Sequence, residues 1–253
     1  LKGGRLCGSW PAPRPAPAMK QPSRELQLCA SELIGTYFLA FTVGVNVLHR
    51  TTLAPISIGL IYMAMISATA PVSGAHFNPA VTVGLLLSGI KHTTVVDVLM
   101  YVTAQACGGL CAGYTLWSVL GATYTLHPGQ GYSVWSVFLV ESLFGAALVF
   151  VVLAIKARPQ DADNQYFALA IGFLVMAAAF AAGDIAGYSL NPAVALGVMM
   201  TNWLHVGGGM EYFHLYLLSP FVGALFAVGC FRIVWEAALR RGMGERTRIL
   251  PPP

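Results

Sequence analysis

The tripeptide Asn-Pro-Ala occurs twice in this chain, each time inside a similar frame of residues. The two copies are Asn78-Pro79-Ala80 and Asn191-Pro192-Ala193. In both, a stretch with Gly and Ser precedes the Asn, and about two turns of apolar residues follow it up to Gly84 or Gly197. Asn is a strong helix N-cap, and Pro suits the first helical position because its missing N–H would be unpaired there anyway. Each copy therefore predicts the start of a short helix.

Composition places these short helices in a membrane protein. Of the 253 residues, 57% are hydrophobic and only 9% are charged, whereas soluble domains carry about 25% charged residues. Six apolar runs approach or exceed the roughly 20 residues needed to cross a bilayer. They are 26–48, 55–72, 95–117, 134–155, 166–182 and 212–234, of which 166–182 is at the short limit. A helix too short to span is tolerated in a membrane only where it lines a cavity walled by protein.

The two halves of the chain repeat one another. The run ELIGTYFLAF from Glu32 matches ESLFGAALVF from Glu141, and each run precedes one Asn-Pro-Ala copy. Tyr101-x3-Gln105 in the third span similarly matches Tyr216-x3-Pro220 in the sixth. Each half is three spans plus one half-helix, and with an odd number of spans the second half must enter the membrane inverted. The two Asn caps are then expected to meet at the centre of the bilayer.

The predicted fold class is an all-α integral membrane protein, with six transmembrane helices and two re-entrant half-helices in an inverted 3+3 repeat. We expect a Pro/Ala/Arg-rich arm over residues 1–24 and a channel domain over 25–235. The repeats of that domain cover about 25–117 and 134–235, and a basic tail follows over 236–253.

Charge predicts the topology. Five of the 14 Lys and Arg lie before the first span and five lie at or after Arg232, whereas Arg50 falls on the opposite side. By the positive-inside rule both termini are expected on the cytoplasmic or equivalent side, in a membrane that the sequence does not identify. The net charge of +4 is explained by this distribution, without nucleic-acid binding. Cys107 and Cys111 share a predicted helix face but have no His or acidic partner nearby, so we expect no metal site.

Glu32 and Glu141 are the only acids deep in spans. A carboxylate there costs several kcal/mol unless it is paired, so each is a candidate functional residue. One interpretation is a proton relay. The favoured one is structural, with each carboxylate accepting hydrogen bonds from loop backbone N–H groups. His76 could similarly form a gate or pack within its loop, and packing is preferred.

The paired motifs and the repeat resemble the major intrinsic protein family, the aquaporins and aquaglyceroporins, from about Glu25 to Trp235. The resemblance implies a homotetrameric channel in the lipid bilayer that passes water and small neutral solutes, and it supports the structural role of the two glutamates. The half-helix dipoles and the amides of Asn78 and Asn191 would turn each passing water, so that protons and cations are excluded. No nucleophile–base pair or cofactor motif is seen, so neither enzyme activity nor a cofactor is expected.

The resemblance also implies a selectivity constriction, formed in this chain by Ile58, Ala179, Tyr188 and Val194. Water-selective relatives usually carry an aromatic residue, a His and an Arg among these positions. This chain therefore departs from them, and we expect a wider and more apolar ring unless Tyr188 swings in. Valine at 194 resembles the plant tonoplast branch, which is associated with water plus urea, ammonia or hydrogen peroxide.

The preferred solute and the transport mode stay open. Glycerol channels carry Asp where this chain has Ala195, and their third and fifth loops are longer than 120–133 and 200–210 here, although Leu217 resembles their pattern. One alternative is a non-conducting subunit of a larger assembly, docked through the Pro-rich arm and the Pro251–Pro253 tail. Another is a proton-coupled carrier that uses Glu32 and Glu141.

Overall fold

The computed structural model describes residues 21–90, 93–157, 166–187 and 189–249, and this part of the chain is entirely helical outside its loops. Six helices are long and apolar enough to cross a membrane, α8 through its segment Phe213–Trp235, and α3 and α7 are shorter. The helices are α1 (Arg24–Leu48), α2 (Ala54–Ser73), α3 (Pro79–Ser88), α4 (Val95–Leu120), α5 (Val134–Lys156), α6 (Phe167–Ala186), α7 (Pro192–Val206) and α8 (Phe213–Ile249). The predicted fold class is confirmed, whereas the Pro-rich arm up to residue 20 lies outside the described residues.

Several helices are longer than the sequence patterns indicate, and α8 continues from the predicted end at Val234 into the predicted basic tail as far as Ile249. α6 continues from the predicted end at Ala182 to Ala186, and it stops at Gly187 with φ 77°. α7 has 15 residues instead of two turns, so it covers most of the predicted loop 200–210. The expected stop at Gly197 was wrong because this glycine lies inside the helix and packs against α4; the helix ends at Gly207 with φ 84°.

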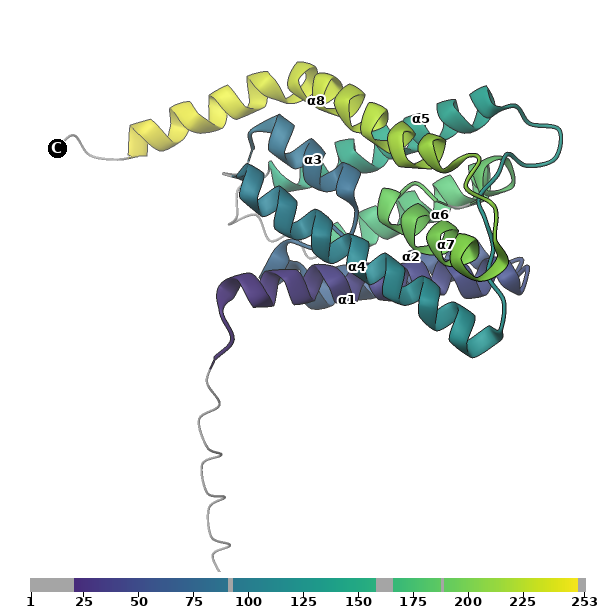
Figure 1. Ribbon diagram of the computed structural model, residues 1–253. Helices are drawn as coiled ribbons and strands as arrows, with labels where there is room; N and C mark the ends of the chain where they lie inside the picture. The colour runs from purple at the N-terminus through teal and green to yellow at the C-terminus, as the bar shows by residue number, and fades with distance from the viewer. Residues whose placement is uncertain (1–20, 91–92, 158–165, 188, 250–253) are drawn as a thin grey trace, which may run out of the picture.

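The helices pack in two equivalent sets. In the first half α1 packs against α4, and in the second half α5 packs against α8 in the equivalent way. The two halves contact one another through α2 and α6. Each half-helix also packs on the last span of the other half, α3 on α8 and α7 on α4. The start of α1 and the C-terminal end of α8 lie at the same end of the bundle (Figure 1). A chain that crosses the bundle an even number of times starts and finishes at the same end. The positions of these two helix ends therefore agree with the prediction that both termini lie on one side of the membrane.

Glycines make the closest helix crossings possible. A Cβ at Gly109 of α4 would clash with the carbonyl oxygen of Ala193 in α7, and one at Gly197 would clash with the backbone of Gly109. Gly108 faces the carbonyl of Leu33 in α1, and Gly223 faces that of Ser142 in α5, which is the equivalent crossing in the second half. Small residues let membrane helices approach at backbone distance.

Candidate functional site

Asn78 and Asn191 are the N-caps of the two short helices. Oδ1 of Asn78 accepts a hydrogen bond from the N–H of Ala80 at 2.9 Å, and Oδ1 of Asn191 accepts one from Ala193 at 2.9 Å. Both asparagines have extended backbones, followed by Pro at the first helical position. The predicted capping is therefore present in both halves. It leaves the N–H donors of each amide pointing away from its own helix.

Those amides connect the two halves crosswise. Nδ2 of Asn78 donates to the carbonyl of Leu190 at 2.9 Å, and Nδ2 of Asn191 donates to the carbonyl of Phe77 at 2.8 Å. Each acceptor immediately precedes the other asparagine in the chain. The structure thus brings the caps together as the inverted repeat predicts, and two reciprocal hydrogen bonds hold the loops in register.

The two acceptor residues have a left-handed backbone. Phe77 has φ 51° and Leu190 has φ 47°, in a region that is uncommon for residues other than glycine. Such conformations cost of order 1–3 kcal/mol and persist only where the surroundings over-determine them. Here the surrounding groups include the crosswise amides and the two buried glutamates, each of which bonds the N–H of one of these residues.

Glu32 holds the first loop through four hydrogen bonds. Oε1 accepts from the Ser73 hydroxyl at 2.7 Å and from the N–H of His76 at 3.0 Å. Oε2 accepts from the N–H of Phe77 at 2.7 Å and from the Gln105 amide at 2.8 Å. The side chain is fully buried. These contacts are the ones that the structural interpretation of this glutamate requires, including the loop backbone N–H groups.

Glu141 holds the second loop with fewer contacts. Oε2 accepts from the N–H of Leu190 at 2.9 Å, and this side chain is also fully buried. Oε1 is buried without a hydrogen-bond partner in the described chain. The two glutamates occupy equivalent places, yet one is saturated with donors and the other is not.

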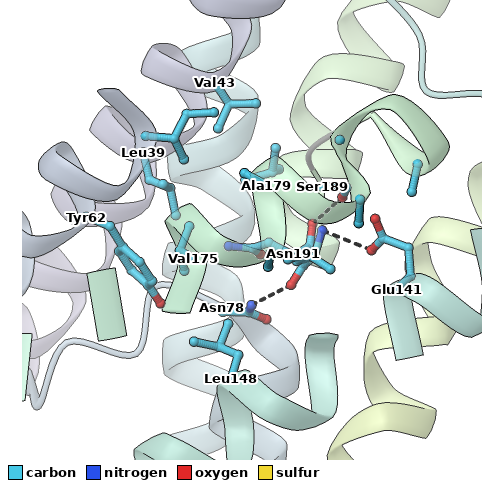
Figure 2. A pocket seen from close by; sticks show the side chains of 17 residues that line it. Leu39, Val43, Tyr62, Asn78, Glu141, Leu148, Val175, Ala179, Ser189 and Asn191 are labelled. Atoms are coloured by element: carbon cyan, nitrogen blue, oxygen red, sulfur yellow. Dashed lines mark hydrogen bonds between the residues drawn. The ribbon is translucent and has the colours of Figure 1, made fainter. Parts of the chain in front are cut away.

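A chamber lies beside the paired caps, with an empty volume of about 550 Å³ that includes open solvent (Figure 2). Asn78 and Asn191 contribute polar groups, Glu141 is among the lining residues although its side chain is fully buried, and aliphatic side chains form most of the wall. Three of the four predicted constriction residues, Ile58, Ala179 and Val194, line this chamber, whereas Tyr188 lies outside the described residues. The remaining lining residues are Leu39, Val43, Tyr62, Leu148, Val175, Ala178, Ala182, Gly183, Ala186, Ser189 and Leu190.

His76 is not among the residues of this chamber. Its Nδ1 lies 3.2 Å from the Thr82 hydroxyl, and its ring centroid lies 4.9 Å from that of Tyr101. The side chain is buried and lines a separate polar pocket together with Lys156, whose Nζ donates to the carbonyl of Gly74 at 2.7 Å. These contacts agree with the preferred interpretation of His76 as a residue that packs within its loop.

Several supporting residues were missed by the sequence argument. The Gln105 amide donates to Glu32 and also to the Thr82 hydroxyl, the latter at 2.9 Å. Tyr62 lines the chamber, and its hydroxyl donates to the carbonyl of His76 at 3.2 Å. A signal for Gln105 was available, because the repeat pairs this polar residue with Pro220. No sequence pattern indicated Tyr62.

Comparisons with known proteins give a consistent family. The family described as "Major intrinsic protein" matches residues 19–231. The probable aquaporin NIP4-2 of Arabidopsis thaliana is 34% identical over an alignment of 219 residues, which covers 80% of this chain and 72% of that protein. Aquaporin AqpM of Methanothermobacter thermautotrophicus is 30% identical over an alignment of 235 residues, which covers 79% of this chain and 93% of that protein. The aquaglyceroporin structure from Plasmodium falciparum has a TM-score of 0.72 at 22% identity, and the match covers 85% of this chain and 99% of that one.

These relatives refine the resemblance noted from the sequence. They include NIP-type plant aquaporins, among them Nodulin-26 of Glycine max at 30% identity, rather than tonoplast proteins. The expected likeness to the tonoplast branch is therefore supported only at the level of the whole family. The chain belongs to the major intrinsic protein family and is a multi-pass membrane channel of the aquaporin and aquaglyceroporin type for water and small neutral solutes, not an enzyme.

Proposed function

We propose that this channel passes urea-sized neutral solutes as well as water, and that Ile58, Ala179 and Val194 form its selective ring together with Tyr188. The observation that carries the proposal is the chamber wall. It presents small or aliphatic side chains at three of the four ring positions, and position 194 carries no charge. Without a fixed guanidinium or imidazole at these three positions, size and desolvation decide which solute enters.

The paired caps would then act as the ion filter. Both half-helices begin at the chamber and direct the positive ends of their dipoles toward it, about half an elementary charge each. A cation that enters loses hydration between two positive helix ends and faces mainly aliphatic walls. A neutral solute instead bonds the asparagine amides and passes.

Solvent-permeability measurements on purified protein in lipid vesicles test this function. Stopped-flow light scattering with water, urea, ammonia, hydrogen peroxide and glycerol should show fluxes above those of protein-free vesicles for water and urea. Shrinkage no faster than in protein-free vesicles would favour the alternative, a non-conducting subunit of a larger assembly. Saturable transport that follows a pH gradient would favour the proton-coupled carrier.

Assembly and orientation are part of the same proposal. Large apolar side chains such as Leu99, Leu143, Phe180 and Ile233 are exposed on the bundle surface, where lipid or neighbouring subunits would cover them. We propose a homotetramer with both termini on the cytoplasmic-equivalent side. Native mass spectrometry would establish the stoichiometry, and protease protection of terminal tags in sealed vesicles would establish the side.

A further inference from the structure

The C-terminal ends of the two half-helices contact equivalent positions of the repeat, at opposite ends of the bundle. Nη2 of Arg232 in α8 donates to the carbonyl of Leu87 in the last turn of α3 at 2.9 Å. The ring of His205 in the last turn of α7 stacks on Trp117 of α4, with ring centroids 4.5 Å apart. Arg232 and Trp117 are equivalent because each lies 16 residues after the paired tyrosine of its span, from 216 to 232 and from 101 to 117. Both half-helices are therefore held at this end by the same position of the repeat, through different chemistry.

The C-terminal end of α3 has few hydrogen bonds to the rest of the protein. The last carbonyls of a helix have no partner within it, so they need other donors. In α3 the carbonyl of Leu86 accepts from the N–H of Gly89 at 3.3 Å, and the carbonyl of Leu85 accepts from the Ser88 hydroxyl at 2.8 Å. Both donors belong to the same turn of the chain. Among the described residues, Arg232 provides the one hydrogen bond from another helix to this end of α3.

The charge of Arg232 strengthens this contact, because the C-terminal end of a helix carries a partial negative charge that a cation stabilises. The other end of α3 begins at Asn78, which lines the chamber. The helix has 10 residues, so the two ends lie roughly 15 Å apart on one short rod. A contact that fixes the C-terminal end therefore limits the tilt of the whole half-helix, including the positive end that it directs toward the chamber.

We propose that Arg232 is a positioning residue of the ion filter, which fixes α3 on α8 and so keeps the positive end of α3 aligned with that of α7. This inference rests on the proposed function, since it requires that the paired caps exclude cations. Cations then leak through a minor population of channels in which α3 is tilted and the two positive ends no longer meet. Loss of the anchor raises this population, because it removes a contact that only the aligned state makes. Neutral solutes are not excluded by the dipoles, so their passage changes little.

The test measures sodium efflux and water permeability in vesicles that contain wild-type protein or the Arg232→Met variant. Methionine keeps an unbranched side chain but has neither the charge nor the donor. Sodium efflux per channel should rise about two- to fivefold, equivalent to roughly 0.4–1 kcal/mol, which is the usual interaction of a cation with a helix C-terminus. Water permeability per channel should stay the same. An unchanged sodium efflux, or an equal change in both fluxes, would overturn the positioning role.

Two further variants separate the anchor from packing and from surface charge. Arg232→Lys keeps a cationic donor at this position and should restore the low sodium efflux. Arg50→Met is the matched control, because Arg50 is also exposed but lies between α1 and α2 and bonds neither half-helix in the part of the chain that the structure describes. It should leave both fluxes unchanged. An efflux that lysine does not lower, or that Arg50→Met reproduces, would reject the anchor as the cause.

A measurement on wild-type protein avoids any dependence on the folding of the variants. Arg232 is exposed, so salt can screen its interaction with the end of α3. Amide hydrogen exchange in the last turn of α3 should accelerate between about 0.01 and 1 M salt, over which the Debye length falls from about 30 to 3 Å. Exchange that does not respond to salt would refute the anchor.

The same vesicles separate this inference from the proposed function. Wild-type channels that pass sodium as readily as water would refute the proposed ion filter, and the positioning role with it. A tight wild-type channel whose sodium efflux is unchanged in Arg232→Met refutes the positioning role alone.

Discussion

Asn78 and Asn191 each donate a hydrogen bond to the carbonyl that precedes the other, at 2.9 and 2.8 Å. Each amide oxygen is already bound to the first turn of its own helix. One side chain therefore does two things, since it caps a helix and connects two inverted halves. The site is therefore formed jointly by the two loops, because the amide of each loop bonds a carbonyl of the other.

The first prediction is that the two asparagines are energetically coupled. Asn78→Ala and Asn191→Ala should each lower the free energy of unfolding by about 1–2 kcal/mol, because each removes a cap and a crosswise bond. The double variant should lose less than the sum of the two, with a coupling of roughly 0.5–3 kcal/mol. Denaturant titration in detergent measures all three. Strictly additive losses would show that the crosswise bonds contribute nothing.

The second prediction concerns Val194. Val194→Arg should reduce urea permeability about tenfold and water permeability less, because charge and bulk return to the proposed ring. Val194→Leu is the control for bulk alone, and it should affect the two solutes more evenly. Stopped-flow light scattering gives both fluxes. If arginine changes neither, the ring lies elsewhere in the chamber.

The third prediction compares the glutamates as stabilising residues. Glu32→Gln replaces one of two oxygens, each of which accepts two hydrogen bonds, with an amide nitrogen. Two buried donors then lose their acceptor, at about 1–3 kcal/mol each. Glu141→Gln should lower the free energy of unfolding by less than about 1 kcal/mol. Glu141 accepts a single hydrogen bond, from the N–H of Leu190, and the amide oxygen of glutamine can still accept it. Unfolding free energies that rank in the reverse order would contradict the hydrogen-bond pattern.

The same pair of variants addresses proton coupling. A relay through Glu32 and Glu141 predicts that a pH gradient drives solute uptake and that either glutamine variant abolishes this drive. The channel proposal predicts no such drive in wild-type vesicles. Uptake measured with and without an imposed gradient separates the two mechanisms.

The fourth prediction concerns the crossing of α4 and α7. Gly109→Ala should destabilise the fold by about 1–3 kcal/mol, because the new methyl group meets the carbonyl of Ala193, at the start of the second half-helix. Gly229→Ala is the matched control, since nothing lies within 4 Å of a Cβ there. Alanine in that helical position should be neutral or slightly stabilising. Equal losses in unfolding free energy for both variants would show that helix contact is not the cause.

Much of the fold follows from local signals in the sequence. The Asn-Pro pairs predict both caps because N-cap and first-turn preferences act within a few residues. The apolar runs predict six spans because bilayer thickness sets helix length. The ends of α6 and α7 were misjudged, because α6 continues past the predicted end at Ala182 and Gly197 lies inside α7, where it packs against Gly109 of α4.

The sequence by itself determined that two short capped helices enter the membrane from inverted halves, since chain-local chemistry and span counting suffice for that. Only the tertiary structure decided which groups meet. It paired each amide with a carbonyl 112 or 114 residues away, gave Glu32 four donors, and left Glu141 with one donor and a second oxygen that is buried without a hydrogen-bond partner in the described residues. The physical reason is that a buried polar atom is satisfied by whatever its neighbours in space present, and a sequence specifies those neighbours only through the complete packing of its helices.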